Sequence, residues 1–317
     1  MASWLAPTMI RIGRTPEAET GCPGEKRSSI SLEMDNDFMA NHVDGKVIVI
    51  TGAAGGFGRL VAQKTAALGA HVVASDVNQA ELDVTVNSIL ETGGSARGVV
   101  ADVVSRSEMS GLAKTAVEYF GSLDVMVNNA GVMPLAFYSD HHEAADAWDR
   151  CIDINLKGVL HGISAVYDQM IAQGRGQIIN ISSIYGNYPV AGAAVYGATK
   201  AAVNVLSESL RQESQGCIKV TTIRPTGVPG TGLAAGVVNP LAVTGILGAK
   251  TAESMETMIS LVQGEDVRAE LTDPESINYF ALAPDLLADQ IVFAIDQPWG
   301  VSISDITVRA SGDTFMI

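Results

Sequence analysis

Cysteine is scarce in this 317-residue sequence, which contains only Cys22, Cys151 and Cys217. Three thiols this far apart match neither a disulfide framework nor the paired ligand spacing of a zinc site. Cys151 falls in a helical pattern, so we expect a core residue and not a reactive one. The sequence therefore offers no thiol-based metal centre and no disulfide-stapled scaffold.

Long apolar runs and positive charge are lacking as well. No stretch of about eighteen or more apolar residues occurs, so we expect no membrane-spanning helix. Lys and Arg number 20 against 35 Asp and Glu, which gives a formal net charge of −15. A surface this acidic repels phosphate backbones and anionic lipids, so we expect neither a nucleic-acid nor a membrane partner. We expect a cytoplasmic protein whose charge serves solubility.

The first 43 residues lack any hydrophobic period. They mix Gly, Pro, Ser, Glu and Arg, without the charged start and long apolar run of a secretory signal. We predict a flexible N-terminal extension over residues 1–43, or a true first residue at Met34 or Met39. An amphipathic targeting segment is a weaker alternative, because the acidic residues argue against it.

From residue 44 onward, short apolar runs alternate with amphipathic stretches, and 47% of the chain is hydrophobic. The apolar runs predict strands over residues 46–50, 71–75, 98–100, 125–128, 177–181, 219–223 and 302–308. The amphipathic stretches predict helices over 58–68, 79–91, 106–120, 144–173, 196–212 and 284–295, with Asn78 and Ser105 as caps. This alternation predicts one α/β domain over residues 44–317, a single doubly wound Rossmann-type parallel sheet with helices on both faces.

One segment breaks this rhythm. Residues 227–282 contain many glycines and prolines, with an amphipathic stretch near 252–262. A long irregular insertion in a compact fold is usually functional. We therefore predict a substrate lid here, before the last helix and strand.

A glycine-rich stretch lies where the first strand ends and the first helix begins. Residues 51–58 read T-G-A-A-G-G-F-G. Gly52 permits a tight turn, Gly56 lets backbone N–H groups approach a pyrophosphate, and Gly58 allows close helix packing. The helix N-terminus then presents its positive end to the phosphates. This position predicts a dinucleotide-binding loop, although many glycine clusters are only turns.

Asp76 ends the second strand, 24 residues after Gly52. A carboxylate at this place can accept both hydroxyls of the adenosine ribose, and it would repel the 2′-phosphate of NADP. No Arg or Lys occurs at Val77, at Asn78 or within residues 53–57 to attract that phosphate. We therefore predict NAD as the cofactor; the alternative is that Asp76 only caps a turn.

Tyr196 and Lys200 lie four residues apart at the start of a predicted helix, so they share one helical face. To act as a base near neutral pH, a tyrosine must lower its pKa of about 10 by roughly three units, or about 4 kcal/mol. A Lys200 ammonium and an oxidised nicotinamide supply positive charge that favours the phenolate. Ser183, at the end of the fifth strand, could hold a substrate oxygen. A lone Tyr-x-x-x-Lys pair also occurs on ordinary solvated helix faces.

Together with further motifs, this pattern resembles the short-chain dehydrogenase/reductase family from about Val43 to about Arg309. The matching motifs are the glycine motif at residues 51–58, Asp102-Val103, Asn128-Asn129-Ala130-Gly131, and the tetrad Asn155, Ser183, Tyr196 and Lys200. The resemblance implies that Tyr196 exchanges the proton, Ser183 orients the substrate oxygen, and Lys200 lowers the tyrosine pKa and holds the nicotinamide ribose. It implies that Asn155 maintains a helix kink and a water that links Lys200 to solvent.

The resemblance also implies which residues bind the cofactor. They are Gly52, Gly56, Phe57 through its backbone, Gly58, Asp76, Asp102, Val103, Asn129, Ala130, Gly131, Tyr196, Lys200, Pro225, Gly227 and Val228. The last three form the loop for the nicotinamide amide, and here the sequence departs from the family pattern. Thr226 follows Pro225 where glycine is usual, and a second Pro-Gly stands at Pro229-Gly230. The register of this loop therefore stays open.

Substrate determinants are expected in residues 133–138, residues 184–189 and the insertion. The side chains predicted to form a mostly apolar pocket are Tyr185, Tyr188, Val190, Val237, Val238, Leu241, Ile246, Leu247, Met255 and Met258. They predict a bulky, weakly polar alcohol or ketone such as a terpenoid, steroid or aromatic compound, unless half of them are simply the core of the insertion. We expect no metal, because the adjacent His141 and His142 should point apart and no third ligand is near.

We therefore predict an NAD-dependent oxidoreductase that interconverts a secondary alcohol and a ketone. Two other functions stay open: a non-catalytic protein that senses the NAD redox state, and an epimerase or lyase on the same fold. The intact Ser183, Tyr196 and Lys200 argue against a sensor. The family resemblance implies a homo-oligomer, either a tetramer or a dimer.

Overall fold

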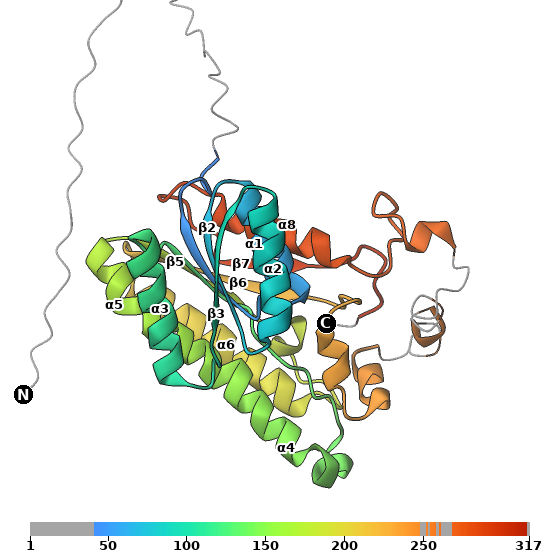
Figure 1. The fold of residues 1–317 in the computed structure, drawn as a ribbon. Helices are drawn as coiled ribbons and strands as arrows, with labels where there is room; N and C mark the ends of the chain where they lie inside the picture. The colour runs from blue at the N-terminus through green and yellow to red at the C-terminus, as the bar shows by residue number, and fades with distance from the viewer. Residues whose placement is uncertain (1–40, 248–251, 253, 258–259, 261–267, 316–317) are drawn as a thin grey trace, which may run out of the picture. The chain divides into compact units, whose positions relative to one another are not determined.

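A parallel sheet of seven strands forms the centre of the described part of the chain, residues 41–247, 252, 254–257, 260 and 268–315 of a computed structural model (Figure 1). The strand order is β3-β2-β1-β4-β5-β6-β7. The strands are β1 (Val47–Thr51), β2 (His71–Asp76), β3 (Ser95–Val100), β4 (Val125–Asn128), β5 (Gly176–Ile181), β6 (Ile218–Pro225) and β7 (Asp305–Val308). Because β1 pairs with both β2 and β4, the winding reverses there, which is where open α/β sheets bind ligands.

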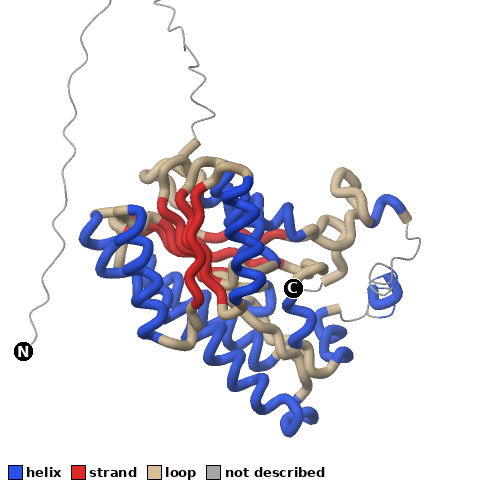
Figure 2. The backbone as a smooth tube through the Cα atoms, in the orientation of Figure 1, coloured by secondary structure: helices blue, strands red, loops and turns tan. Residues whose placement is uncertain are grey.

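Helices cover both faces of this sheet (Figure 2). They are α1 (Gly56–Ala67), α2 (Gln79–Glu91), α3 (Arg106–Phe120), α4 (His141–Ile152), α5 (Val159–Gln173), α6 (Ala194–Glu213) and α8 (Pro284–Ile295). One buried cluster draws on α1, α2 and α8, and a second draws on α3, α5 and α6. Because both faces are covered, every residue of β1 and β5 is buried. The predicted doubly wound, Rossmann-type α/β fold is confirmed.

Local capping rules place several helix ends correctly. The side chain of Asn78 accepts the Glu81 N–H, and that of Ser105 accepts the Glu108 N–H, as N-cap residues do. The predicted helix over 144–173 differs from the structure. It begins already at His141 and is divided by a π-helical segment, η3 (Asp153–Gly158). The apolar pattern alone predicted one continuous helix, whereas the family resemblance had implied a helix kink at Asn155, which lies in this segment.

The two edge strands were predicted least well. The structure begins β3 at Ser95, earlier than the predicted 98, and begins β7 at Asp305, later than the predicted 302. Edge strands pair on one side only, and part of each is exposed, so their apolar pattern is weak.

Most of the predicted N-terminal extension, up to residue 40, lies outside the described residues. Its last three residues are held by the fold: the Asn41 side chain donates to the Leu68 carbonyl at 2.7 Å, and the His42 N–H donates to Asp296 at 2.6 Å. Val43 is fully buried in the core. The folded unit therefore includes residues that we assigned to the extension. No helix among the described residues is long and apolar enough to cross a membrane.

The predicted insertion connects β6 to α8. Its described part contains short 3₁₀ helices, η5 (Gly232–Gly236), η6 (Pro240–Ile246) and η8 (Ala269–Leu271). Close backbone approaches fix η6, because a Cβ on Gly192 would lie 2.7 Å from the Ala242 side chain. Part of the predicted 252–262 stretch, including Met258, lies outside the described residues.

Candidate active site

The candidate residues gather at the carboxyl edge of the sheet. The glycine-rich loop follows β1, Asp76 ends β2, and residues 129–131 follow β4. Ser183 follows β5, and the loop from Pro225 to Val228 follows β6. Parallel strands place all their carboxyl ends on one edge, so segments far apart in the sequence meet there.

The glycine-rich loop depends on its glycines for shape. Gly52 and Gly56 have φ values of +66° and +50°, which favour glycine. A Cβ on Gly58 would overlap the carbonyl oxygen of Gly52, so only glycine fits there. Asn129 donates its side-chain amide to the carbonyls of Thr51 and Gly52, at 2.9 and 3.1 Å. The Asn129 side chain thus holds the loop, and its expected contact with a cofactor stays a prediction.

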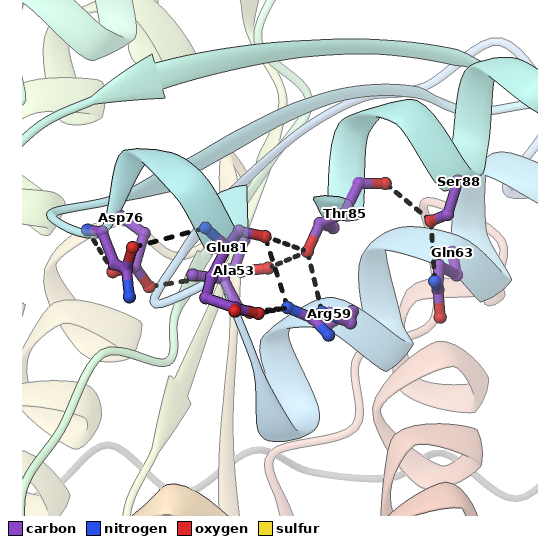
Figure 3. A network of polar contacts seen from close by, with 9 residues as sticks. Ala53, Arg59, Gln63, Asp76, Glu81, Thr85 and Ser88 are labelled. Atoms are coloured by element: carbon purple, nitrogen blue, oxygen red, sulfur yellow. Dashed lines mark hydrogen bonds and ion pairs between the residues drawn. The ribbon is translucent and has the colours of Figure 1, made fainter. Parts of the chain in front are cut away.

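Figure 3 shows a polar network beside this loop. Asp76 Oδ2 accepts the Ala54 N–H at 3.1 Å, and Arg59 donates to the carbonyl oxygen of the same alanine. Arg59 also donates to Thr85 Oγ1 at 2.9 Å and pairs with the Glu81 carboxylate at 2.7 Å. Arg59, on the first turn of α1, is a basic residue near the loop that we did not predict from the sequence.

The surroundings of Asp76 fit both of its predicted roles, the cap of a turn and the acceptor for ribose hydroxyls. Its Oδ1 accepts the Asn78 N–H at 3.0 Å, so the carboxylate does cap the turn after β2. A carboxylate has about four acceptor positions, so the two backbone N–H groups leave capacity for ribose hydroxyls.

Ser183, Tyr196 and Lys200 are buried together. Ser183 lies beside Tyr196 and favours its phenolate, and Lys200 Nζ donates to the Ile181 carbonyl at 2.8 Å. The short helix η4 (Ile184–Gly186) follows Ser183 and packs directly on α6. A Cβ on Gly186 would lie 2.7 Å from the backbone carbon of Lys200, so glycine permits this contact.

Burial acts against the charged forms of both titratable groups. Burial raises the pKa of Tyr196 to about 12, and the hydrogen bond with Ser183 opposes this rise. Burial lowers the pKa of Lys200 to about 8. The stabilisation needed for a phenolate near neutral pH is therefore larger than the roughly three pKa units that we expected from an ordinary tyrosine.

Asn155 connects the end of β4 to Lys200. It lies in the π-helical segment η3 and is fully buried. Its amide donates to the Val132 carbonyl at 2.8 Å, and its oxygen accepts the Val132 N–H at 2.9 Å. A Cβ on Gly131 would lie 3.3 Å from Asn155 Oδ1 and 3.7 Å from Lys200 Nζ. Asn155 thus keeps the backbone of this segment close to the lysine.

The loop after β6 carries two threonines in different settings. Thr226 Oγ1 is buried and has no hydrogen-bond partner within the described residues. The Thr231 side chain lies 3.9 Å from the position that a Cβ on Gly56 would take. Thr231 therefore faces the glycine-rich loop, and Thr226 holds an unused hydroxyl beside Pro225.

The remaining candidates for cofactor binding have distinct exposures. Asp102 is exposed, with Oδ1 accepting the Val104 N–H at 3.0 Å, and Val103 is buried. The ring of Phe57 is buried in the core, so only its backbone faces the loop.

The apolar residues predicted for substrate binding separate into three groups. Tyr185 packs edge-on against Tyr196, with ring centroids 5.6 Å apart. Ile246 and Leu247 are fully buried, so they belong to the core of the insertion. Tyr188 and Leu241 are 62% and 66% exposed, so they are open to solvent. The predicted pocket thus includes both core and surface residues.

The two adjacent histidines do not point apart as we expected. The rings of His141 and His142 lie 3.9 Å apart, because both side chains turn to the same side at the first turn of α4. Among the described residues, no group of three or more His, Cys, Asp or Glu is arranged to hold a metal ion.

Comparison with known proteins finds relatives over most of the chain. Residues 46–240 match the profile of the family described as short chain dehydrogenase. An uncharacterized oxidoreductase of Listeria monocytogenes is 35% identical over 266 residues, which cover 84% of this chain and 96% of that protein. One from Staphylococcus epidermidis is 30% identical over 267 residues, covering 84% and 98%.

Solved structures with the same fold include nicotinamide complexes. A short chain dehydrogenase/reductase from Burkholderia phymatum in complex with NAD is 27% identical, with a TM-score of 0.66, covering 84% of this chain and 90% of that chain. A metagenomic short-chain oxidoreductase in complex with NADP is 28% identical, with a TM-score of 0.64, covering 84% and 98%. A 7α-hydroxysteroid dehydrogenase complexed with NADH and 7-oxo glycochenodeoxycholic acid is 26% identical, with a TM-score of 0.69, covering 87% and 97%.

Proposed function

The chain belongs to the short-chain dehydrogenase family, and from this premise we propose that it is an NAD-dependent oxidoreductase that interconverts a secondary alcohol and a ketone. Membership of the family makes it an oxidoreductase; the reaction and the cofactor are our proposal. The observation that carries it is the joint burial of Ser183, Tyr196 and Lys200, with Ser183 beside the tyrosine and Lys200 one helical turn away.

A nicotinamide ring, when bound, would supply the hydride acceptor or donor. In alcohol oxidation, Tyr196 Oη takes the proton of the substrate hydroxyl while the hydride leaves the carbon that bears it, and ketone reduction reverses both transfers. Ser183 donates a hydrogen bond to the substrate oxygen and stabilises the charge that develops on it. Both hydroxyls can act on one substrate oxygen because Ser183 and Tyr196 are buried beside each other.

Lys200 and Asn155 support this proton transfer. Lys200 Nζ lies 5.7 Å from the centre of the Tyr196 ring, so the charge of its ammonium form favours the Tyr196 phenolate. Its ammonium has further N–H donors, besides the one directed at Ile181, for a ribose hydroxyl. Asn155 keeps the chain after β4 in contact with this lysine.

The dinucleotide would lie along the carboxyl edge of the sheet. The residues proposed to hold it are Gly52, Gly56, Phe57, Gly58, Asp76, Asp102, Val103, Asn129, Ala130, Gly131, Tyr196, Lys200, Pro225, Gly227 and Val228. Their surroundings fit such a group: a Cβ would fill the cradle at Gly58, and Thr226 offers a buried hydroxyl without a partner among the described residues.

We choose NAD over NADP because of the charges near β2. Asp76 would repel a 2′-phosphate, and the nearby base Arg59 is already paired with Glu81. The Burkholderia phymatum relative was solved with NAD and the metagenomic one with NADP, so the relatives are compatible with either choice.

For the substrate we propose a bulky, weakly polar alcohol or ketone. Tyr185 beside Tyr196 supplies an apolar wall, and one relative is a hydroxysteroid dehydrogenase. Residues 227–282 are proposed to act as the lid. A cytoplasmic homo-oligomer, dimer or tetramer, completes the proposal; the free thiols of Cys151 and Cys217 suit a reducing compartment.

A Tyr196→Phe variant tests the proposed chemistry. It removes one hydroxyl and keeps the ring, so NADH should still bind while turnover falls by about 10²–10⁴-fold. We would screen a panel of alcohols and ketones with NAD and NADH, following the nicotinamide absorbance. The pH-dependent rise of alcohol oxidation should also be missing from any residual activity of the variant.

Other outcomes of this screen would point elsewhere. A Tyr196→Phe variant with near wild-type turnover and an unchanged pH profile would refute the mechanism. Binding of NADH without net oxidation of any alcohol would favour a redox sensor, and conversion of a substrate without net NADH formation would favour an epimerase or lyase.

A further inference from the structure

The chain beyond β7 returns to the candidate active site. Arg309 pairs with Asp313 at 2.6 Å and donates to the Phe315 carbonyl oxygen at 2.9 Å. The Gly312 N–H donates to the Tyr279 carbonyl at 2.8 Å, which ties this segment to the stretch before α8. These bonds hold Phe315 in a defined place.

The ring of Phe315 lies against Gly227 in the loop after β6. A Cβ on Gly227 would be 2.5 Å from Phe315 Cζ and 2.8 Å from its Cε2, so the ring or the loop would have to shift to admit a side chain. Gly227 is not among the glycines with positive φ, so its backbone would accept other residues. The space that a side chain at this position would need is therefore taken up by the aromatic ring.

The same ring reaches the neighbourhood of Ser183. Phe315 packs against the buried cluster of Ile184, Ile246 and Leu247, and Ile184 directly follows Ser183 in the chain. One side chain thus contacts the loop after β6 and the cluster that adjoins the candidate catalytic serine. No motif in the sequence pointed to this residue.

We propose that Phe315 is a positioning residue that holds the loop after β6 at Gly227 and so sets how the nicotinamide half of the cofactor lies against Ser183. The proposal rests on the proposed function, because it assigns that loop to the nicotinamide. Loss of the ring lets the loop shift, and a methyl group at residue 227 forces the ring and the loop apart.

The test is a double-mutant cycle with Gly227→Ala and Phe315→Ala in the full chain. We would titrate NADH and NADPH by nicotinamide fluorescence, measure kcat and KM, and record the melting temperature without ligand. Gly227→Ala should weaken dinucleotide binding by about tenfold, and adding Phe315→Ala should recover most of that loss. Phe315→Ala alone should weaken binding about threefold, with a nearly unchanged melting temperature.

Two control variants separate this effect from general damage. Gly300→Ala adds a methyl group outside the proposed lid, where nothing lies within 4 Å. Phe293→Ala removes a half-exposed ring from α8. Both should bind dinucleotide like the wild type. If Phe315→Ala does not fold, Phe315→Leu, which is smaller than the ring but still apolar, replaces it in the cycle.

The proposal is overturned if Gly227→Ala binds dinucleotide normally, or if the two effects simply multiply in the double variant. Different results would contradict the proposed function. If NADPH binds and NADH does not, the cofactor choice is wrong, yet the coupling can still be read from NADPH. If the wild type binds neither dinucleotide, both proposals fall.

Discussion

At the residue scale, the surroundings of Tyr196 and Lys200 govern proton transfer. Burial makes the phenolate of Tyr196 costly and the ammonium of Lys200 easy to lose. The phenolate therefore forms only where positive charge lies close to it, which ties its basicity to Lys200 and to an oxidised nicotinamide. Alcohol oxidation should consequently speed up as the pH rises, whereas ketone reduction needs the neutral tyrosine.

Asp76 is the residue that we expect to decide cofactor choice. An Asp76→Asn variant removes the negative charge and keeps one side-chain oxygen, which can accept one of the two backbone N–H groups that Asp76 binds. The ratio of kcat/KM for NAD to that for NADP should fall by at least about tenfold, because the repulsion of a 2′-phosphate is lost. Steady-state kinetics with both cofactors would check this, and a wild type that prefers NADP would contradict it.

At the scale of elements, α1 and α2 together shape the glycine-rich loop. Asp76 accepts a hydrogen bond from the N–H of Ala54, and Arg59 on α1 donates one to the carbonyl oxygen of Ala54. Thr85 and Glu81 on α2 fix the guanidinium in turn. The loop conformation thus depends on the packing of two helices, as well as on the glycines within it.

Replacing Arg59 tests this role of the two helices. Arg59→Met keeps the aliphatic stem and removes the donors to Ala54 and Thr85. We expect a loss of stability of about 1–3 kcal/mol, from lost hydrogen bonds to a charged group, and weaker NADH binding. Arg211→Met is the matched control, because Arg211 pairs with Glu208 on an exposed face of α6. It should leave the free energy of unfolding nearly unchanged, because exposed ion pairs contribute little to stability. Equal effects of the two variants in urea unfolding would show that Arg59 has no special role.

At the scale of the whole molecule, the two edges of the sheet differ. The carboxyl edge carries the candidate site. At the amino edge, the cations of Lys46, Arg175 and Lys219 lie 4.9, 5.1 and 5.2 Å from the ring centre of Trp299. Lys46 also donates to the Ile295 carbonyl at 2.7 Å, which joins β1 to the end of α8. These contacts at the amino edge therefore join β1 to α8 and stabilise the fold.

Lys46 should make stability depend on pH. Burial and the neighbouring Lys219 lower its pKa from 10.5 to about 8, against the opposing charges of Asp296 and Asp124. Between these two pKa values the unfolded chain binds more protons than the folded one, so this contribution to stability rises with pH. We compare the free energy of unfolding of the wild type with that of Lys46→Met. This difference should shift in favour of the wild type by on the order of 2 kcal/mol from pH 7 to pH 10. Urea unfolding at both pH values measures it, and a constant difference would contradict it.

Sequence by itself determined what depends on neighbouring residues along the chain. The apolar runs of β1 and β4, the caps at Asn78 and Ser105, and the bounds of α2 and α8 follow from local periodicity and side-chain chemistry. The candidate site residues were likewise found from motif spacing, because parallel strands bring their carboxyl ends to one edge in any such fold.

Only the tertiary structure decided what depends on contacts between distant segments. It placed Arg59 on the carbonyl of Ala54, Phe315 on Gly227, and Val43 in the core. It also showed that burial raises the pKa of Tyr196. From the sequence we had expected only that this pKa must be lowered for catalysis. Burial and packing arise from the whole stack of sheet and helices, and spacing along the chain carries no record of which distant side chain fills a given space.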